Sequence, residues 1–193
     1  MTIVRFSALL LVLTLPMTCA AQPTAPQSAE APAQVDPARV YGNMIRTAER
    51  AVVGLAEAMP EEKYSFAPAA DLFRAGQVPE FKGVRTFAQQ VAHVASSNYE
   101  YLQGMGLEKD KDIAGIEKLT TKAEALQALK DSFAAAEKAA ATITPQNAFE
   151  GMGPKKLTTR AALAAAIAWH TMDHCGQMVV YARMNGVVPP QSR

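Results

Sequence analysis

The sequence predicts an all-α fold, a four-helix bundle with one crossover connection, and three observations lead to it. Alanine is abundant and aromatic residues make up only 7% of the chain, a composition that favours helices over sheets. Four segments carry apolar residues at spacings of three and four, and none shows the alternation of a half-buried strand. The connections between these segments are long, which favours one crossover over a simple up-down order.

Size and charge limit the classes of protein that fit this sequence. The chain has 193 residues and is 49% hydrophobic, which suits one domain with a packed core. The formal net charge is +1 and no basic stripe stands out, so we expect no nucleic-acid partner.

Residues 1–21 have the pattern of a signal peptide. Arg5 supplies a positive charge, and residues 6–16 form an apolar run that is too short to cross a bilayer as a helix. Small residues follow this run, and we expect cleavage after Ala20 or Ala21. A membrane anchor left in place is the alternative interpretation of the same run.

Export is the expected consequence for localisation. We expect a periplasmic or secreted protein with no stable membrane association after cleavage. Lipid attachment at Cys19 ranks below simple secretion, because Pro16 and Thr18 are poor neighbours for it. Cleavage would leave Cys175 as the one cysteine, so no internal disulfide is expected.

The rest of the chain divides into a linker and one domain. Residues 22–35 are rich in Pro, Ala, Ser and Gln without apolar periodicity, which predicts a flexible tether. Residues 36–190 hold all four helical segments, and we assign them to a single bundle domain.

The first helix begins after Asp36, an N-cap residue that is followed by Pro37 at the first helical position, and Pro60 ends it. Its predicted inner face consists of Val40, Met44, Thr47, Ala51, Leu55 and Ala58. The segment 61–83 that follows is longer than an ordinary loop, and such loops are often functional or lie over a site.

The second helix begins after Thr86, which is predicted to form a capping box with Gln89. It extends to about Gln103, where two glycines stop it. The centre of its apolar arc is formed by Phe87, Val91, Val94 and Leu102. His93 lies at the edge of this arc, which predicts a site at the rim of the bundle that is open to solvent.

The third and fourth helices complete the bundle. The third extends from Thr121 to about Ile143, and Pro145 ends it. Its predicted inner face consists of Ala123, Leu126, Leu129, Phe133, Ala136 and Ala140. The fourth is capped by Thr158 and continues to Asn185, where a glycine follows.

The three histidines of the chain form the candidate metal site. His170 and His174 lie four residues apart, so they project from one face of the fourth helix, one turn apart. Two imidazoles placed in this way can hold one metal ion. With His93 on the second helix they form a set of three, typical of a catalytic or substrate-binding metal with open coordination positions.

Alternatives remain open around these histidines. A histidine pair at this spacing also arises by chance in many helices. Asp173 is a fourth ligand, an outer-shell partner or a solvated surface residue. Cys175 lies off the histidine face, so we interpret it as a packing residue. Imidazole ligands suit zinc, nickel, copper and iron alike, and we expect a divalent ion, zinc or nickel.

Three stretches carry a pattern shared with a known family. The most specific is HTMDHCGQMVVYARMNGVVPP at 170–190, with two of the histidines at its start and two prolines at its end. VRTFAQQVAHVA at 84–95, with Asn98 after it, and MPEEKYSF at 59–66 support it. These stretches resemble the fourth-helix signature, the second-helix motif and the first-loop segment of the DinB-like family, the damage-inducible family. The resemblance covers nearly all of 36–190.

The resemblance implies a four-helix bundle with a crossover and a metal held by three histidines, which match His93, His170 and His174 one for one. Family members are commonly dimers, so it also implies a homodimer. Some relatives are thiol-cofactor transferases or isomerases, and many have no known activity. The predicted export argues against a thiol-transferase role for this chain, because the low-molecular-weight thiols used by those relatives are mainly cytosolic.

Two functions are therefore expected for an exported metal-binding protein. One is a metal-dependent hydrolase or thiol-transferase-like enzyme, because a bound ion can lower the pKa of its water towards ~7 or activate a thiolate. Asp173 beside the ligands and Glu100 on the face of His93 are the candidate general bases. The alternative is a non-catalytic, stress-related module that binds metal or a small ligand, and the absence of a second catalytic constellation favours it.

Overall fold

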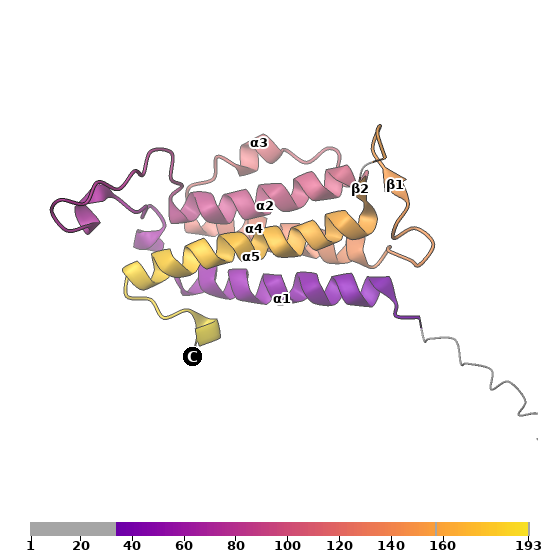
Figure 1. The fold of residues 1–193 in the computed structure, drawn as a ribbon, viewed down its shortest axis with the longest axis horizontal. Coiled ribbons are helices and arrows are strands. Elements are labelled where there is room, and N and C mark those ends of the chain that lie inside the picture. Colours follow the sequence, from indigo (N-terminus) through magenta and orange to yellow (C-terminus); the bar gives the residue numbers. More distant parts are fainter. Residues whose placement is uncertain (1–33, 157, 193) are drawn as a thin grey trace, which may run out of the picture. The chain divides into compact units, whose positions relative to one another are not determined.

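The computed structural model describes residues 34–156 and 158–192 as a bundle of four long helices (Figure 1). The predicted signal peptide and residues 22–33 of the predicted linker lie outside this range. The long helices are α1 (Pro37–Ala58), α2 (Phe87–Gly104), α4 (Lys122–Ala140) and α5 (Arg160–Met184). The short elements are η1 (Glu61–Lys63), η2 (Ala70–Leu72), α3 (Ile113–Ile116), β1 (Gly151–Met152), β2 (Thr158–Thr159) and η3 (Pro190–Ser192).

The order of the helices around the bundle confirms the predicted crossover. α1 packs against α4 and α5, and α2 packs against the same two helices, so α1 and α2 lie diagonally opposite each other. The Nζ of Lys122, at the start of α4, donates to the carbonyls of Glu57 and Met59 at the end of α1. The backbone N–H of Ala88, at the start of α2, donates to the carbonyl of Tyr64 just beyond α1. α2 and α4 therefore start at the same end, and the chain between them must return along the bundle.

That return is made by the crossover connection, residues 105–121, which includes α3. α3 packs on the outer side of α2 (Figure 1). Ile116 of α3 is buried, whereas most of the rest of the connection is exposed. The sequence predicted this connection as a long segment without a helix, and α3 is an addition.

Local signals placed the starts of two helices correctly. Asp36 caps α1 by accepting from the N–H of Ala38. Thr86 and Gln89 exchange both hydrogen bonds of a capping box at the start of α2. These caps hold because each is completed by groups two or three residues away.

Two predicted helix boundaries were wrong. The N-cap of α5 is Thr159, whose hydroxyl accepts from the N–H of Ala162, and not Thr158. Thr158 lies one residue earlier and, like Thr159, belongs to a two-stranded hairpin that no sequence pattern indicates. α4 ends at Ala140, three residues before the predicted Ile143, because its last turn tightens into bonds between residues three apart.

The predicted inner faces were partly wrong as well. In α1, Val40 and Met44 are exposed, and the buried residues are Gly42, Ile45, Ala48, Val52, Leu55 and Ala56. In α4, Ala123 is exposed and Ala125 is buried in its place. Alanine and glycine carry too little apolar surface to mark a face by periodicity, so the packing partners set the rotation of these helices.

The long segment after α1 is only partly packed. Tyr64 is buried and its hydroxyl donates to the carbonyl of Ala56, while Phe66 makes an edge contact with Tyr181 of α5. Beyond Phe66 the segment projects from the end of the bundle and is largely exposed (Figure 1). Among the described residues, no helix combines the length and the apolar character that a bilayer span requires.

Candidate metal centre

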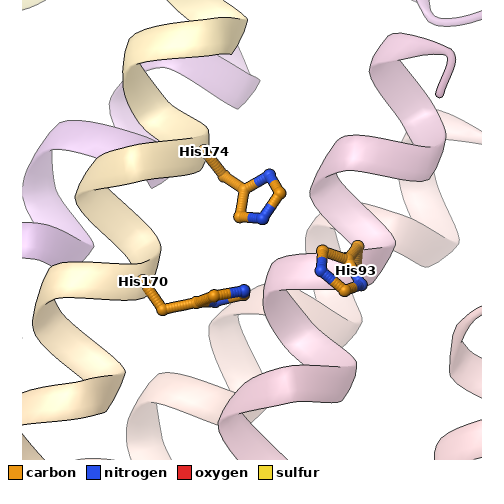
Figure 2. Close-up of side chains that lie close together, drawn as sticks. All are labelled: His93, His170 and His174. Atoms are coloured by element: carbon orange, nitrogen blue, oxygen red, sulfur yellow. The ribbon is translucent and has the colours of Figure 1, made fainter. Parts of the chain in front are cut away.

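The structure brings the three histidines together at the interface of α2 and α5. Figure 2 shows the rings of His170 and His174 on α5 and of His93 on α2 pointing toward one another. One ligand atom from each ring lies within 4.8 Å of those of the other two. The ring centroids are 4.6 Å apart for His170 and His174, and 4.7 and 5.2 Å from His93 to His174 and His170.

Polar contacts between α2 and α5 hold this arrangement in register. The side-chain amide of Gln90 on α2 donates to the Oε1 of Gln177 on α5 over 3.0 Å. The hydroxyl of Tyr181 donates to the carbonyl of Arg85, just before α2, over 3.1 Å. Both hydrogen bonds lie on the same side of the histidines, toward the start of α2 and the end of α5, and they fix how the two segments face each other there.

His174 is oriented by Gln90. Its Nδ1 lies 2.6 Å from the Oε1 of Gln90, and this oxygen can only accept. Nδ1 of His174 therefore carries the proton, and the lone pair is on Nε2. This is the tautomer in which a histidine binds metal through Nε2 while its other nitrogen donates to an outer-shell acceptor.

His93 is oriented by Glu117, which comes from the crossover connection. Nδ1 of His93 lies 2.7 Å from the Oε1 of Glu117, and the hydroxyl of Ser96 donates to the same oxygen over 2.9 Å. The guanidinium of Arg85 also approaches Nδ1 of His93 to 3.3 Å. Nδ1 of His93 cannot both donate to Glu117 and accept from Arg85, so only one of these two contacts is a hydrogen bond. The shorter one, to a carboxylate, sets the tautomer, and Arg85 acts as a nearby charge.

His170 lacks such a partner. Its Nδ1 is buried and has no hydrogen-bond partner among the described residues. The rings of Tyr101 and Trp169 contact its ring edge to face, with centroids 5.8 and 6.0 Å away. A buried ring nitrogen without a partner is costly, and a metal ion at the triad is one way to satisfy this ring.

The electrostatics of the site favour neutral rings at His170 and His174. Burial, together with the neighbouring His170 and His93, lowers the pKa of His174 to about 4. Burial and His93 also lower the pKa of His170. Burial raises the pKa of Glu117, but hydrogen bonds from His93 and Ser96 outweigh it, and the net shift is downward. Neutral rings beside a charged carboxylate are the protonation states that metal binding requires.

Three imidazole nitrogens are suitable ligands for a divalent ion, and their spacing is close to the spacing that such an ion requires. Two nitrogens bound at ~2.05 Å to a tetrahedral ion are roughly 3.4 Å apart. The three candidate nitrogens lie within 4.8 Å of one another, so any pair must approach by at most ~1.4 Å to bind one ion. His93 and His170 are partly exposed whereas His174 is buried, so the open edge of the site is on the side of His93 and His170.

The other residues singled out in the sequence do not join the triad. Asp173 is exposed and accepts from the side-chain amide of Gln177, so it acts on the histidines through its charge. Glu100 is exposed, and the carboxylate at His93 is that of Glu117. Cys175 is buried in the core, and burial raises the pKa of its thiol, as expected of a packing residue.

Sequence reasoning missed the residues that orient the rings. Gln90 lies one turn before His93, but nothing in the sequence pairs it with His174. Glu117 lies in a connection that showed no pattern, and only the path of the crossover brings it to α2. Arg85 belongs to one of the family-like stretches, but no sequence pattern places its charge beside His93.

The comparisons with known proteins agree with this geometry. The sequence pattern of the DinB superfamily matches residues 44–178, more than half of the chain, and this range includes all three histidines. Curated proteins and solved structures gave no significant match. With the crossover bundle, the histidine triad and this match in agreement, the chain belongs to the DinB superfamily.

Proposed function

We propose that this protein is an exported metal-binding protein in which His93, His170 and His174 hold one divalent ion, zinc or nickel. One observation carries the proposal: three imidazoles from two helices converge, and in two of them Nδ1 lies within hydrogen-bond distance of an acceptor. That arrangement leaves Nε2 of His93 and His174 as the ligand atoms. Histidine triads without a fourth protein ligand leave coordination positions for water or a small ligand.

Elemental analysis of the purified protein tests this proposal directly. We expect about one equivalent of metal per chain in wild type and a large loss in His170→Ala and in His174→Ala. Glu100→Gln is the matched control, because Glu100 is an exposed side chain of α2. The proposal is refuted if wild type contains no metal, or if both histidine variants contain as much metal as wild type.

Catalysis at this site is the finer proposal. When bound, the ion would supply a nucleophilic water or an activated thiolate, which suits a hydrolase or a thiol-transferase-like enzyme. Burial favours the neutral rings of His170 and His174, and the partly exposed His93 leaves an edge of the site open to a small molecule. Screening metal-loaded protein with hydrolase and thiol-transfer substrates tests this, and genuine turnover must disappear in His170→Ala.

A binding module without turnover is the second candidate function, and one observation favours it. The carboxylates nearest the triad are both engaged, Glu117 with His93 and Ser96 and Asp173 with Gln177. Neither is left as an obvious general base at the open edge of the site. Tight metal binding with no turnover in the screen is the result expected of such a module.

Export and assembly complete the proposal. The apolar run in residues 1–21 supports export to the periplasm or beyond, with processing near Ala20. Mature protein that begins at Met1 in the cytosol, found by N-terminal sequencing, would overturn this. The homodimer is an expectation from the family, and light scattering of the purified protein measures it. We propose no nucleic-acid partner.

A further inference from the structure

Glu117 connects a candidate metal ligand to the crossover connection. It follows α3 directly and reaches α2, where its Oε1 accepts from Nδ1 of His93 over 2.7 Å and from Ser96 over 2.9 Å. Its side chain is 35% exposed, so the contact forms at the border between the core and solvent.

Apart from backbone hydrogen bonds at the end of α2, such as that from Leu107 to Leu102, few polar contacts tie the crossover connection to α2. The side-chain amide of Gln103 donates to the carbonyls of Glu108 and Lys111, and the Nζ of Lys111 lies 4.5 Å from the ring centroid of Tyr99. These contacts hold the first half of the connection. In the second half, Ile116 supplies apolar packing.

A carboxylate at Nδ1–H of a histidine affects the metal at the other ring nitrogen in two ways. It fixes the tautomer and the ring orientation, and it makes Nε2 a more basic ligand. In return, a cation at Nε2 draws electron density from the ring and makes Nδ1–H a stronger donor. Coupling of this kind is reciprocal, so what strengthens metal binding must strengthen the carboxylate contact by the same factor.

We propose that Glu117 is a positioning residue that acts through His93, and that it couples metal occupancy to docking of the crossover connection on α2. The inference rests on the proposed metal site. It goes further by making the crossover connection a part of the protein that responds to metal. Metal binding then tightens the second half of the connection, and removal of metal loosens it.

Metal affinity of Glu117 variants provides the first test. Glu117→Ala removes both the charge and the acceptor, whereas Glu117→Gln keeps a carbonyl oxygen of the same reach. We expect Kd for Zn²⁺, measured by competition with a chromophoric chelator, to rise about 10- to 100-fold in Glu117→Ala and less in Glu117→Gln. Glu100→Gln on α2 is the control and should bind as wild type does.

Hydrogen exchange provides a readout that a purely structural role would not produce. In wild type we expect Zn²⁺ to slow amide exchange across residues 112–119, and in both Glu117 variants this protection should be reduced or lost. Far-UV circular dichroism checks that each variant is folded. If Glu117→Ala fails to fold, Glu117→Gln decides both measurements.

The outcomes separate the two proposals. Wild type that binds no Zn²⁺ overturns the metal site and the coupling together. Wild type that binds Zn²⁺, with unchanged Kd and unchanged protection in the Glu117 variants, overturns the coupling alone. A weaker Kd with undiminished protection of 112–119 would show that Glu117 orients His93 without linking the connection to the metal, and would also overturn the coupling.

Discussion

Metal should raise the thermal stability of this protein without being needed for its fold. The three ligands come from α2 and α5, and only the folded chain brings His93 to the pair on α5. At a free metal concentration about 100 times Kd, a ligand that binds only the native state adds about 2.7 kcal/mol. For a domain of this size each kcal/mol raises Tm by roughly 2–4 °C, so we expect a shift of roughly 5–11 °C.

The apo-protein should remain folded because the core does not depend on the triad. Large buried side chains such as Phe87, Phe133 and Ile167 lie in a continuous apolar cluster contributed by all four long helices. Burial of a side chain of this kind contributes about 1.5–3 kcal/mol. The metal therefore adds to a fold that is already stable.

Thermal melts followed by circular dichroism, with Zn²⁺ or with a chelator, measure the effect. His93→Ala should lose most of the metal-dependent shift while it keeps the helix content of wild type. Glu100→Ala changes another exposed position of α2 and should keep the full shift.

Two results would refute this reasoning. If a chelator unfolds wild type outright, the site is a closed structural one and the open-edge interpretation is wrong. If Zn²⁺ leaves the Tm of wild type unchanged, the three histidines are not a metal site.

Three other predictions concern pH, capping and the core. Burial, with the neighbouring His170 and His93, lowers the pKa of His174 to about 4. Between that value and the ordinary imidazole pKa near ~6.5, the unfolded chain therefore binds a proton that the folded chain does not. Apo stability should therefore fall as pH falls through this window, by about 1–3 kcal/mol in urea unfolding, and a flat profile would contradict it. Thr159→Ala should cost about 1 kcal/mol as the true cap of α5 and Thr158→Ala less, and the reverse order would show that the cap is misplaced. Phe133→Ala should cost about 3–5 kcal/mol by denaturant unfolding because Phe133 is fully buried, whereas Phe149→Ala, at an exposed position, should be near neutral.

The helices and most of their starts could be predicted because their signals are local. Asp36 with Pro37, and Thr86 with Gln89, form caps within one turn of the chain, so no distant contact is needed to complete them. The pairing of His170 with His174 is equally local, since a spacing of four residues places both on one helix face. Family resemblance then extended the site to His93.

The face that each helix buries was not determined by the local sequence. α1 exposes Val40 and Met44 and buries Ala48, although apolar spacing favoured the opposite. Small residues are buried where a neighbouring helix approaches closely, and that approach depends on the partner's side chains. The position of the α5 cap likewise depended on a hairpin, because Thr158 and Thr159 both pair with β1 and the second of them becomes the N-cap.

The orientation of the ligand rings depended on contacts between distant parts of the chain. Gln90 meets His174 because α2 and α5 pack side by side, and Glu117 meets His93 because the crossover connection returns along α2. A carboxylate in a connection has no periodicity to reveal its neighbours. Its partner is set by the path of the chain around the core, because the free energy that fixes this path comes from apolar burial summed over the whole bundle.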